Sequence, residues 1–256
     1  MNDNRKFIIG SRGSKLSLAY STHAKNLLIK SNSKLDNNSI EIKVIKTSGD
    51  IFQNKRISEI GGKGVFCKQI EEELLESKID LAVHSLKDLP TKMTDGLCVN
   101  AVVKRNDPRD AFLSYSNKSF NDLDPKSKIG TSSFRRHAQL RLLRNDIEIV
   151  TMRGNIDTRI KKLKDEKLDA IVLAAAGVKS LHLENEIGLV FDTSEILPAA
   201  GQGIIAVQCR KDNVSIQKII NKINDNETSL CALAERKMLA TIGGDCDTAI
   251  GGLAEI

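Results

Sequence analysis

The feature that most constrains the fold of this chain is a repeated alternation of short apolar segments with longer amphipathic ones. The alternation runs to residue 103, is interrupted by the charged, proline-containing stretch 104–109 (KRNDPR), and then starts again. Such alternation predicts βαβ units, in which helices cover a mainly parallel sheet. We therefore predict an α/β fold with two lobes, similar in layout to hinged ligand-binding proteins.

The periodicity of apolar residues places the individual elements. In residues 65–77, Phe66, Ile70 and Leu74 follow one another at intervals of four, which is the spacing of one buried helix face. Further helices are predicted at 15–29, 133–144 and 156–166. Strands are predicted at 6–10, 40–47, 79–84, 97–103, 128–131, 147–152, 169–173 and 204–209.

Two interruptions predict where the chain passes between lobes. The first is 104–109, and the second is the glycine-rich stretch 197–203 (LPAAGQG), after which strand 204–209 returns to the first lobe. The predicted domains are therefore residues 1–104 with about 200–212, residues 105–199, and residues 213–256. The last of these, with two helices and a Gly-rich loop, is predicted to be a small third α+β domain.

Charge and hydropathy exclude some classes of protein. The chain has 256 residues and a formal net charge of +6, which favours anionic partners. Its lysine-rich stretch 161–167 (KKLKDEK) also contains acids and is typical of a solvated helix face. The net charge is therefore the only support for the hypothesis that the protein binds nucleic acid. No apolar run approaches the ~18 residues of a membrane span, and the five cysteines show no metal-ligand spacing. We expect a soluble, cytoplasmic protein without disulfides or metal.

Polar clusters follow four of the predicted strands, where ligands bind in open α/β sheets. They combine hydroxyls or arginines with the amide groups of a helix N-terminus, which suits carboxylate or phosphate. For any single cluster, helix capping with surface charge is the favoured explanation, whereas four clusters together favour an extended polyanionic ligand. The clusters occupy residues 11–14, 84–88, 131–136 and 153–155.

Three residues have both a chemical and a structural explanation. Asp88 follows Lys87 just past a buried strand, so it is either a general acid/base or a turn aspartate beside a solvated lysine. Cys246 lies in a Gly-rich loop (GGDC) and is either a nucleophile or covalent anchor, or a chance free thiol. The other four cysteines lie in apolar patterns and are interpreted as buried hydrophobes. His84 is interpreted as a hydrogen-bonded, partly buried residue rather than as a catalyst.

Nine motifs, in order along nearly the whole chain, resemble the hydroxymethylbilane synthase (porphobilinogen deaminase) family. Among them are GSRGSKLSLA (10–19), DLAVHSLKDLP (80–90), GTSSFRRHAQL (130–140), MRGNIDTR (152–159), LPAAGQGIIAVQCR (197–210) and ALAERKMLATIGGDC (232–246). The resemblance implies two lobes like those of periplasmic binding proteins and a cofactor-bearing third domain, which we expect to be C-terminally truncated here.

The resemblance also implies an activity. Family members condense four porphobilinogen molecules onto a dipyrromethane cofactor held by a thioether, and water releases the linear product. It implies Asp88 as catalytic residue and Cys246 as cofactor anchor. Cofactor contacts are expected from Lys87, Ser133, Arg135, Arg136, Arg153, Gly154 and Arg159, and substrate contacts from Arg12, Ser14, Lys63 and Gln202. It further implies a monomer that uses neither nucleic acid nor membrane.

A competing hypothesis is a binding protein without catalytic activity. Two α/β lobes with two connections also describe solute receptors and the sensor domains of transcription regulators. That class would need neither Asp88 nor Cys246 for its function. The two hypotheses are therefore distinguished by the surroundings of these side chains.

Overall fold

The computed structural model describes residues 6–51, 64, 66–244 and 248–256. Its contacts divide the chain into two units. Unit 1 comprises Met1–Arg105, Ile204–Ala234 and Ile256, and unit 2 comprises Asn106–Gly203 and Glu235–Glu255. The chain changes unit after Arg105 and after Gly203, at the two interruptions noted in the sequence, and again after Ala234 and after Glu255. A separate third domain from residue 213 stays a prediction.

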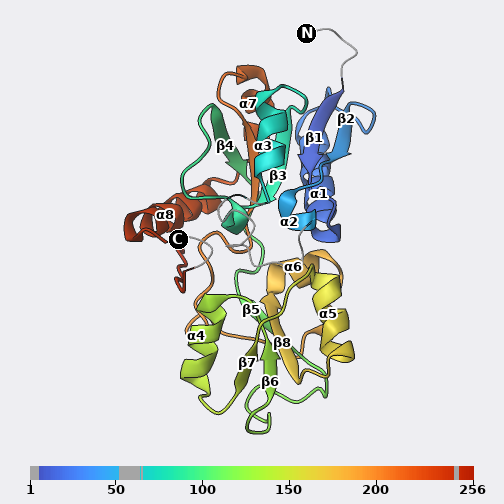
Figure 1. The fold of residues 1–256 in the computed structure, drawn as a ribbon. Coiled ribbons are helices and arrows are strands. Elements are labelled where there is room, and N and C mark those ends of the chain that lie inside the picture. Colours follow the sequence, from blue (N-terminus) through green and yellow to red (C-terminus); the bar gives the residue numbers. More distant parts are fainter. Residues whose placement is uncertain (1–5, 52–63, 65, 245–247) are drawn as a thin grey trace. The chain divides into compact units, whose positions relative to one another are not determined.

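Unit 1 is built on a five-stranded sheet of order β2-β1-β3-β10-β4 (Figure 1). Its strands are β1 (Phe7–Ser11), β2 (Ile40–Val44), β3 (Leu81–Ser85), β4 (Leu97–Val102) and β10 (Ile205–Arg210). β1 runs parallel to both β2 and β3, as predicted. The return of β10 to this unit is confirmed, since it pairs with β3 and β4. Both of those pairings are antiparallel, so the sheet is more mixed than predicted.

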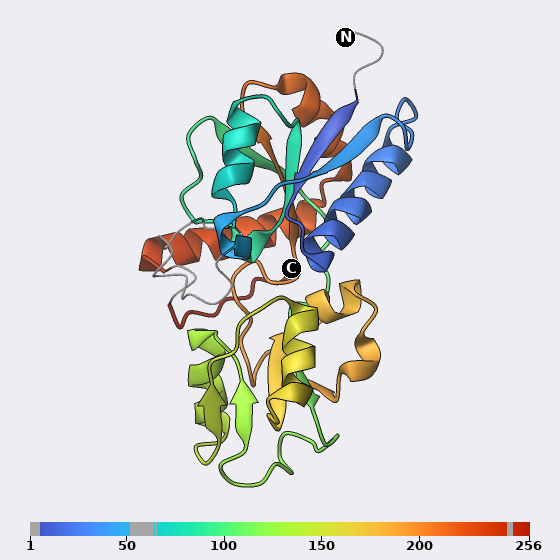
Figure 2. The ribbon, with the colours of Figure 1, turned by 45° about the vertical axis from the view of Figure 1, so that its right-hand side comes forward.

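Helices cover both faces of this sheet. The helices of this unit are α1 (Lys15–Ser31), α2 (Ser48–Ile51), α3 (Lys68–Leu75), α7 (Val214–Ile220) and the first part of α8 (Asn226–Ile242), whose residues from Glu235 onward belong to unit 2, with short 3₁₀ turns η2 (Leu86–Asp88) and η4 (Asn221–Ile223). Leu28 of α1 packs with Val83 of β3 in one apolar cluster, and α3 packs with Ala82 in another. Side chains alternate between the faces of a strand, so β3 supplies both clusters. Figure 2 shows α1 and α3 on opposite sides of the sheet.

Unit 2 repeats this plan with a five-stranded sheet of order β7-β6-β8-β5-β9. Its strands are β5 (Asp110–Ser114), β6 (Lys128–Gly130), β7 (Glu148–Val150), β8 (Ala170–Ala174) and β9 (Leu189–Val190). Its helices are α4 (Phe134–Leu143), α5 (Ile156–Asp165) and α6 (Ala175–Ser180), with the 3₁₀ turn η3 (Glu184–Glu186). β6 is parallel to β7 and β8, whereas β5 is antiparallel to β8 and β9. The sequence analysis missed β5, β9 and α6.

Aromatic packing closes one side of the unit 2 core. Phe112, Phe120 and Phe191 form three edge-to-face pairs, with ring centroids 5.2–6.0 Å apart. This geometry is favoured because the positive edge of one ring meets the negative face of the next. Elsewhere, Cys67, Cys209 and Cys231 are buried as predicted, whereas Cys98 is only half-buried.

Candidate functional site

The candidate site residues of unit 1 follow two neighbouring strands. β1 and β3 are parallel, with Ile9 opposite Leu81, so the chain leaves both strands at the same edge of the sheet. Arg12 and Ser14 follow β1, and Lys87 and Asp88 follow β3. The two clusters that the sequence placed on this lobe therefore begin at the same edge of the sheet.

Asp88 lies on a short turn that is firmly attached to the core. It ends η2, in which Leu86 and the following Leu89 are both buried while Asp88 is exposed. The Leu86 amide donates to Ile204 O at 2.9 Å, and the Leu89 amide donates to Leu86 O at 3.1 Å. These contacts hold the backbone on both sides of Asp88 in place. The Asp88 carboxylate is therefore attached to a fixed turn and is open to solvent.

The neighbouring hydroxyl and guanidinium have structural contacts of their own. Ser14 is the N-cap of α1, and its Oγ accepts from the Ser17 amide at 3.2 Å. The Arg12 guanidinium carbon lies 4.0 Å from the centre of the Phe66 ring, a cation–π contact. The capping hypothesis is thus confirmed for Ser14, and binding of substrate by either side chain stays a prediction.

His84 is a buried member of a hydrogen-bond chain, as interpreted from the sequence. Its Nε2 lies 3.0 Å from Gln208 Oε1, and Gln208 Nε2 donates to Glu71 Oε1 at 2.7 Å. Thr94 Oγ1 in turn donates to Glu71 Oε2 at 2.6 Å. Burial lowers the pKa of His84 to about 4 despite the Gln208 hydrogen bond, and the charge of Arg12 acts in the same direction as burial. The imidazole is therefore neutral at neutral pH.

The candidate residues of unit 2 also follow neighbouring parallel strands. Ser133 follows β6, and Arg153 and Gly154 follow β7. The two connections are joined, because the Thr131 amide donates to Val150 O at 2.9 Å and the Ser132 hydroxyl donates to Met152 O. Ser133 is the N-cap of α4, accepting from the Arg136 amide at 3.4 Å.

Gly154 meets a local requirement at the end of β7. Its φ is +118°, and a Cβ there would come within 2.7 Å of Thr158 Cγ2, so a larger residue is excluded. Arg159 Nε donates to the Gly154 carbonyl at 2.8 Å, which ties the first turns of α5 back to this connection. Arg153, Gly154 and Arg159 therefore form one local group.

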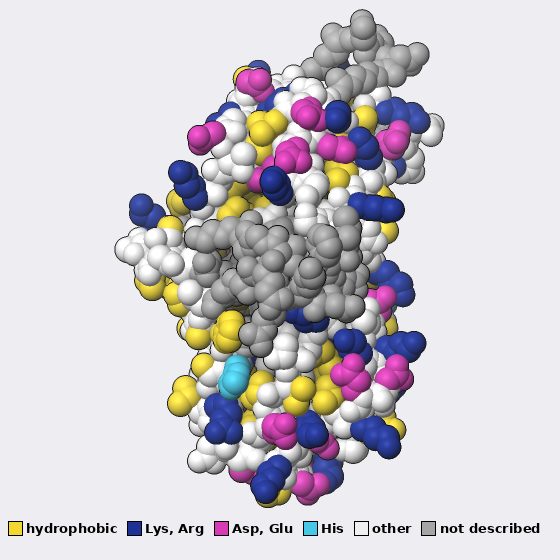
Figure 3. Space-filling model, in the orientation of Figure 1, with side chains coloured by type: hydrophobic (Ala, Val, Ile, Leu, Met, Phe, Trp, Pro, Cys, Tyr) yellow, Lys and Arg dark blue, Asp and Glu magenta, His cyan; other side chains and the backbone are white. Residues whose placement is uncertain are grey.

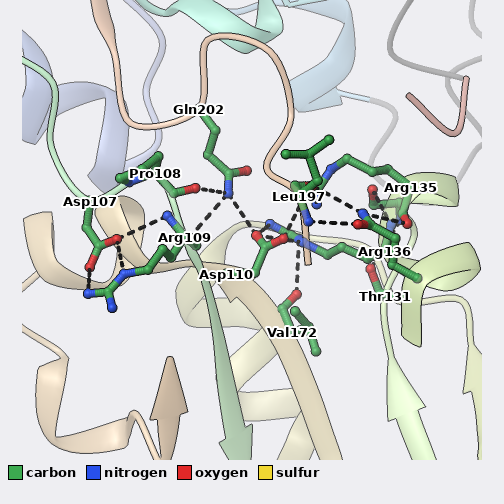
Figure 4. Close-up of polar contacts among 12 residues, drawn as sticks. Asp107, Pro108, Arg109, Asp110, Thr131, Arg135, Arg136, Val172, Leu197 and Gln202 are labelled. Carbon is green, nitrogen blue, oxygen red and sulfur yellow. Dashed lines mark hydrogen bonds and ion pairs between the residues drawn. The ribbon is translucent and has the colours of Figure 1, made fainter. Parts of the chain in front are cut away.

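Arg135 and Arg136 have a partner that the sequence analysis did not identify, the fully buried Asp110 at the start of β5 (Figure 4). Arg135 Nη2 donates to Asp110 Oδ2 at 2.7 Å, and Arg136 donates through Nε and Nη2 to Oδ1 at 3.0 and 2.7 Å. One further donor of each arginine reaches a backbone carbonyl, Arg135 Nη1 that of Leu197 and Arg136 Nη1 that of Val172. Both guanidinium groups are thus engaged within the protein.

Gln202 completes this buried cluster. Its Nε2 donates to Asp110 Oδ1 at 2.8 Å and to Pro108 O at 2.7 Å. Burial by itself raises the pKa of Asp110, but the charges of Arg136 and Arg135 outweigh it and lower the pKa to about 2. A sequence signal for Asp110 did exist, since an acid that begins an apolar strand (DAFLS) requires a cation nearby.

The Asp110 cluster carries an excess of positive charge. Two arginines, 4% and 6% exposed, face one carboxylate, so the buried group has a formal charge of +1. Arg135 Nε is also buried without a hydrogen-bond partner among the described residues. A buried cation without full compensation is costly, and an anionic ligand nearby would lower that cost. These features fit a cofactor or substrate that carries carboxylates.

Two predicted site residues, Cys246 and Lys63, lie outside the described residues. On the face drawn in Figure 3, basic and acidic side chains are interspersed over both units. That face shows no continuous basic patch of the kind that nucleic-acid binding requires. No described helix is long and apolar enough to span a membrane.

Comparison with protein families gives a direct match. Residues 7–218 match the family model described as "Porphobilinogen deaminase, dipyromethane cofactor binding domain". A porphobilinogen deaminase of Syntrophomonas wolfei is 46% identical over 252 residues, covering 98% of this chain and 81% of the relative. Those of Ehrlichia canis (46% identical; 96% and 82% covered) and Staphylococcus carnosus (42%; 98% and 81%) are similarly close.

Among solved structures, the similarity extends to periplasmic solute-binding proteins. The methionine-binding protein MetQ aligns with a TM-score of 0.54 at 13% identity, covering 99% of this chain and all of MetQ. A periplasmic substrate-binding protein of an ABC transporter from Coxiella burnetii has a TM-score of 0.50 at 12% identity, with 94% and 99% covered. At such low identity these matches establish the two-lobe fold alone.

Proposed function

The chain belongs to the porphobilinogen deaminase family, and on that premise we propose how its residues divide the work of the reaction. The protein is a transferase of tetrapyrrole biosynthesis, with porphobilinogen as substrate and dipyrromethane as cofactor. The family reaction adds four porphobilinogen molecules in turn, each with loss of ammonia, and ends when water releases hydroxymethylbilane. The bound dipyrromethane supplies the pyrrole to which substrate is added.

Asp88 is the catalytic carboxylate of this proposal. The observation that carries it is the exposed carboxylate on a turn whose backbone is fixed by buried Leu86 and Leu89. A carboxylate held in this way stabilises positive charge that develops on the substrate as ammonia departs, and it can accept a proton. Lys87, from the same turn, would neutralise a substrate carboxylate.

The positively charged groups of both units would hold the pyrrole carboxylates. Each pyrrole carries an acetate and a propionate, so a growing chain presents many carboxylates to be paired. In unit 2, Arg153 and Arg159 are grouped around Gly154, while Arg135 contributes the excess charge of the Asp110 cluster. In unit 1, Arg12 and Ser14 stand beside the strand that precedes Asp88. Arg136 and Gln202 would act by holding Asp110 and Arg135 in place.

Cys246 would be the cofactor anchor, and Lys63 would be a further substrate contact. Residues 213–256 are proposed to form the third domain. We further propose a cytoplasmic monomer. The family membership supports the thiol assignment, because the bound cofactor requires a nucleophile and Cys246 follows two glycines that permit close approach.

The variant Asp88→Asn tests the catalytic assignment. The amide keeps the shape of the side chain but removes its charge and basicity, so turnover of porphobilinogen should fall by roughly 100-fold or more. Intact mass spectrometry should still detect dipyrromethane on the purified variant. Asp95→Asn, which changes an exposed aspartate elsewhere in unit 1, is the matched control and should turn over normally. Near-normal turnover of Asp88→Asn would remove Asp88 from the catalytic role.

A further inference from the structure

Helix α8 ends in a motif that fixes the chain just before Cys246. Gly243 has a φ of +73°, its amide donates to Ala240 O at 3.3 Å, and the Gly244 amide donates to Leu239 O at 2.9 Å. These bonds form a Schellman motif, in which a glycine in the left-handed region terminates the helix. A Cβ on Gly244 would lie 2.5 Å from Ile250 Cδ1, so the chain beyond the cysteine packs back against the helix end.

The returning chain then contacts the segment 197–201 of the same unit. The Gly252 amide donates to Pro198 O at 2.8 Å. A Cβ on Gly251 would lie 2.9 Å from Leu197 O and 3.1 Å from Pro198 O, so the two backbones approach as closely as glycine allows. The chain is therefore attached on both sides of residues 245–247.

Glu235 connects these two segments to the helix. It lies on α8 with only 2% of its surface exposed. Its Oε2 accepts from the Gly201 amide at 2.6 Å, and its Oε1 accepts from the Ala254 amide at 2.8 Å. Hydrogen bonds to a carboxylate are about twice as strong as those between neutral groups. One side chain therefore joins α8, the segment 197–201 and the chain that returns from Cys246.

We propose that Glu235 is a positioning residue for the Cys246 thiol. By holding Gly201 and Ala254 together, it sets the path of the chain on which the cysteine is carried, and so favours attachment of the cofactor. This inference rests on the proposed role of Cys246 and extends it. The attachment step forms a bond between Cys246 Sγ and the aminomethyl carbon of porphobilinogen. It breaks the carbon–nitrogen bond, and the thiol proton leaves with the nitrogen as ammonia.

The test follows cofactor attachment directly. Cofactor-free protein, produced in cells that cannot make porphobilinogen, is mixed with porphobilinogen, and the mass increment on Cys246 is followed with time. The variant Glu235→Gln keeps the side-chain shape, but its amide nitrogen cannot accept a hydrogen bond, so one backbone amide loses its partner. We expect attachment about tenfold slower or more, since small displacements of a nucleophile have large effects on rate.

The matched control is Glu71→Gln in unit 1. Glu71 is also a buried glutamate with two donors, Gln208 and Thr94, but it lies on α3 and contacts neither segment. With each protein assayed equally far below its melting temperature, Glu71→Gln should attach the cofactor at the wild-type rate. Equal slowing in both variants would show general destabilisation and overturn the proposal.

The outcomes separate this inference from the function on which it rests. Wild-type protein that gains no mass on Cys246 would overturn the anchor assignment and this inference with it. Normal attachment in wild type and in Glu235→Gln alike would overturn the positioning role alone. Where Glu235→Gln fails to fold, Gly251→Ala perturbs the same junction by crowding Leu197 O and Pro198 O. It should also attach the cofactor slowly, and attachment at the wild-type rate would count against the proposal.

Discussion

The two units bury polar side chains next to their candidate site residues in opposite ways. In unit 1, a neutral imidazole, His84, is linked through Gln208 to Glu71. In unit 2, Asp110 stays ionised between Arg135 and Arg136. Removing ions from water costs several kcal/mol each unless they are paired, whereas a neutral ring needs only a hydrogen bond. The unit 2 cluster therefore depends on complete pairing far more than the unit 1 chain does.

The hydrogen-bond chain in unit 1 also fixes the tautomer of His84. Gln208 Nε2 donates to Glu71, so the amide oxygen of Gln208 faces the imidazole. An oxygen can only accept, and the proton of the neutral ring is therefore on Nε2. Glu71 is thus connected to the His84 imidazole through one intervening amide. In unit 2 no such intermediary is present between Asp110 and the arginines, because ions contact one another directly.

The largest effect is expected from Asp110→Asn. This change leaves two buried guanidinium groups without a countercharge and should lower the free energy of unfolding by about 3–5 kcal/mol. Denaturant titration measures the loss. Glu71→Gln, which leaves no buried cation, should cost no more than about 1–3 kcal/mol. If the two variants lose the same stability, the contrast between a network with buried cations and one without them is wrong.

The second effect is a difference in pH dependence between the units. The pKa of His84 is lowered to about 4 from its ordinary value of 6.5, so as the pH falls the unfolded chain takes up this proton before the folded chain does. The contribution of His84 to the free energy of unfolding is fully present above about pH 6.5. It should fall by about 3 kcal/mol as the pH drops to 4. The lowered pKa of Asp110, about 2, makes its contribution decline only below about pH 4.

The variant His84→Gln isolates the unit 1 part of this dependence. It replaces the titrating ring by a neutral group, so its stability should be nearly level between pH 6.5 and 4. Unfolding free energies of variant and wild type, measured across that range, provide the comparison. Parallel curves for the two proteins would show that His84 does not titrate as its burial requires.

The smallest effect is expected from the two caps. Ser14→Ala and Ser133→Ala each remove a hydroxyl that accepts from an amide of the first helical turn. Each should lower the free energy of unfolding by about 1 kcal/mol, as typical N-caps do. Thermal or denaturant unfolding of both variants checks this. A cost several times larger at one position would mean that its hydroxyl supports more than the helix start.

Prediction from sequence succeeded where local patterns dominate. The start of α1 at Lys15 was predicted to the residue, and α4 starts one residue after the predicted Ser133, because that serine is the cap that precedes the helix. It failed for β5 and β9. β9 has only two residues, and β5 begins with the charged Asp110, although it is buried from Asp110 to Leu113. A charged residue can be predicted to lie in a buried strand only when its partners are known, and the partners of Asp110 lie on α4.

The sequence by itself determined the βαβ alternation, two of the positions at which the chain changes unit, and the order of motifs that resembles one enzyme family. Periodicity, turns and motifs are local properties, so they can be recognised in the sequence without knowledge of tertiary contacts. The tertiary structure alone decided that Arg135 and Arg136 share Asp110, and that Glu235 joins Gly201 to Ala254. Those partners are far apart in sequence, and only folding brings a charge to the donors that offset its lost hydration.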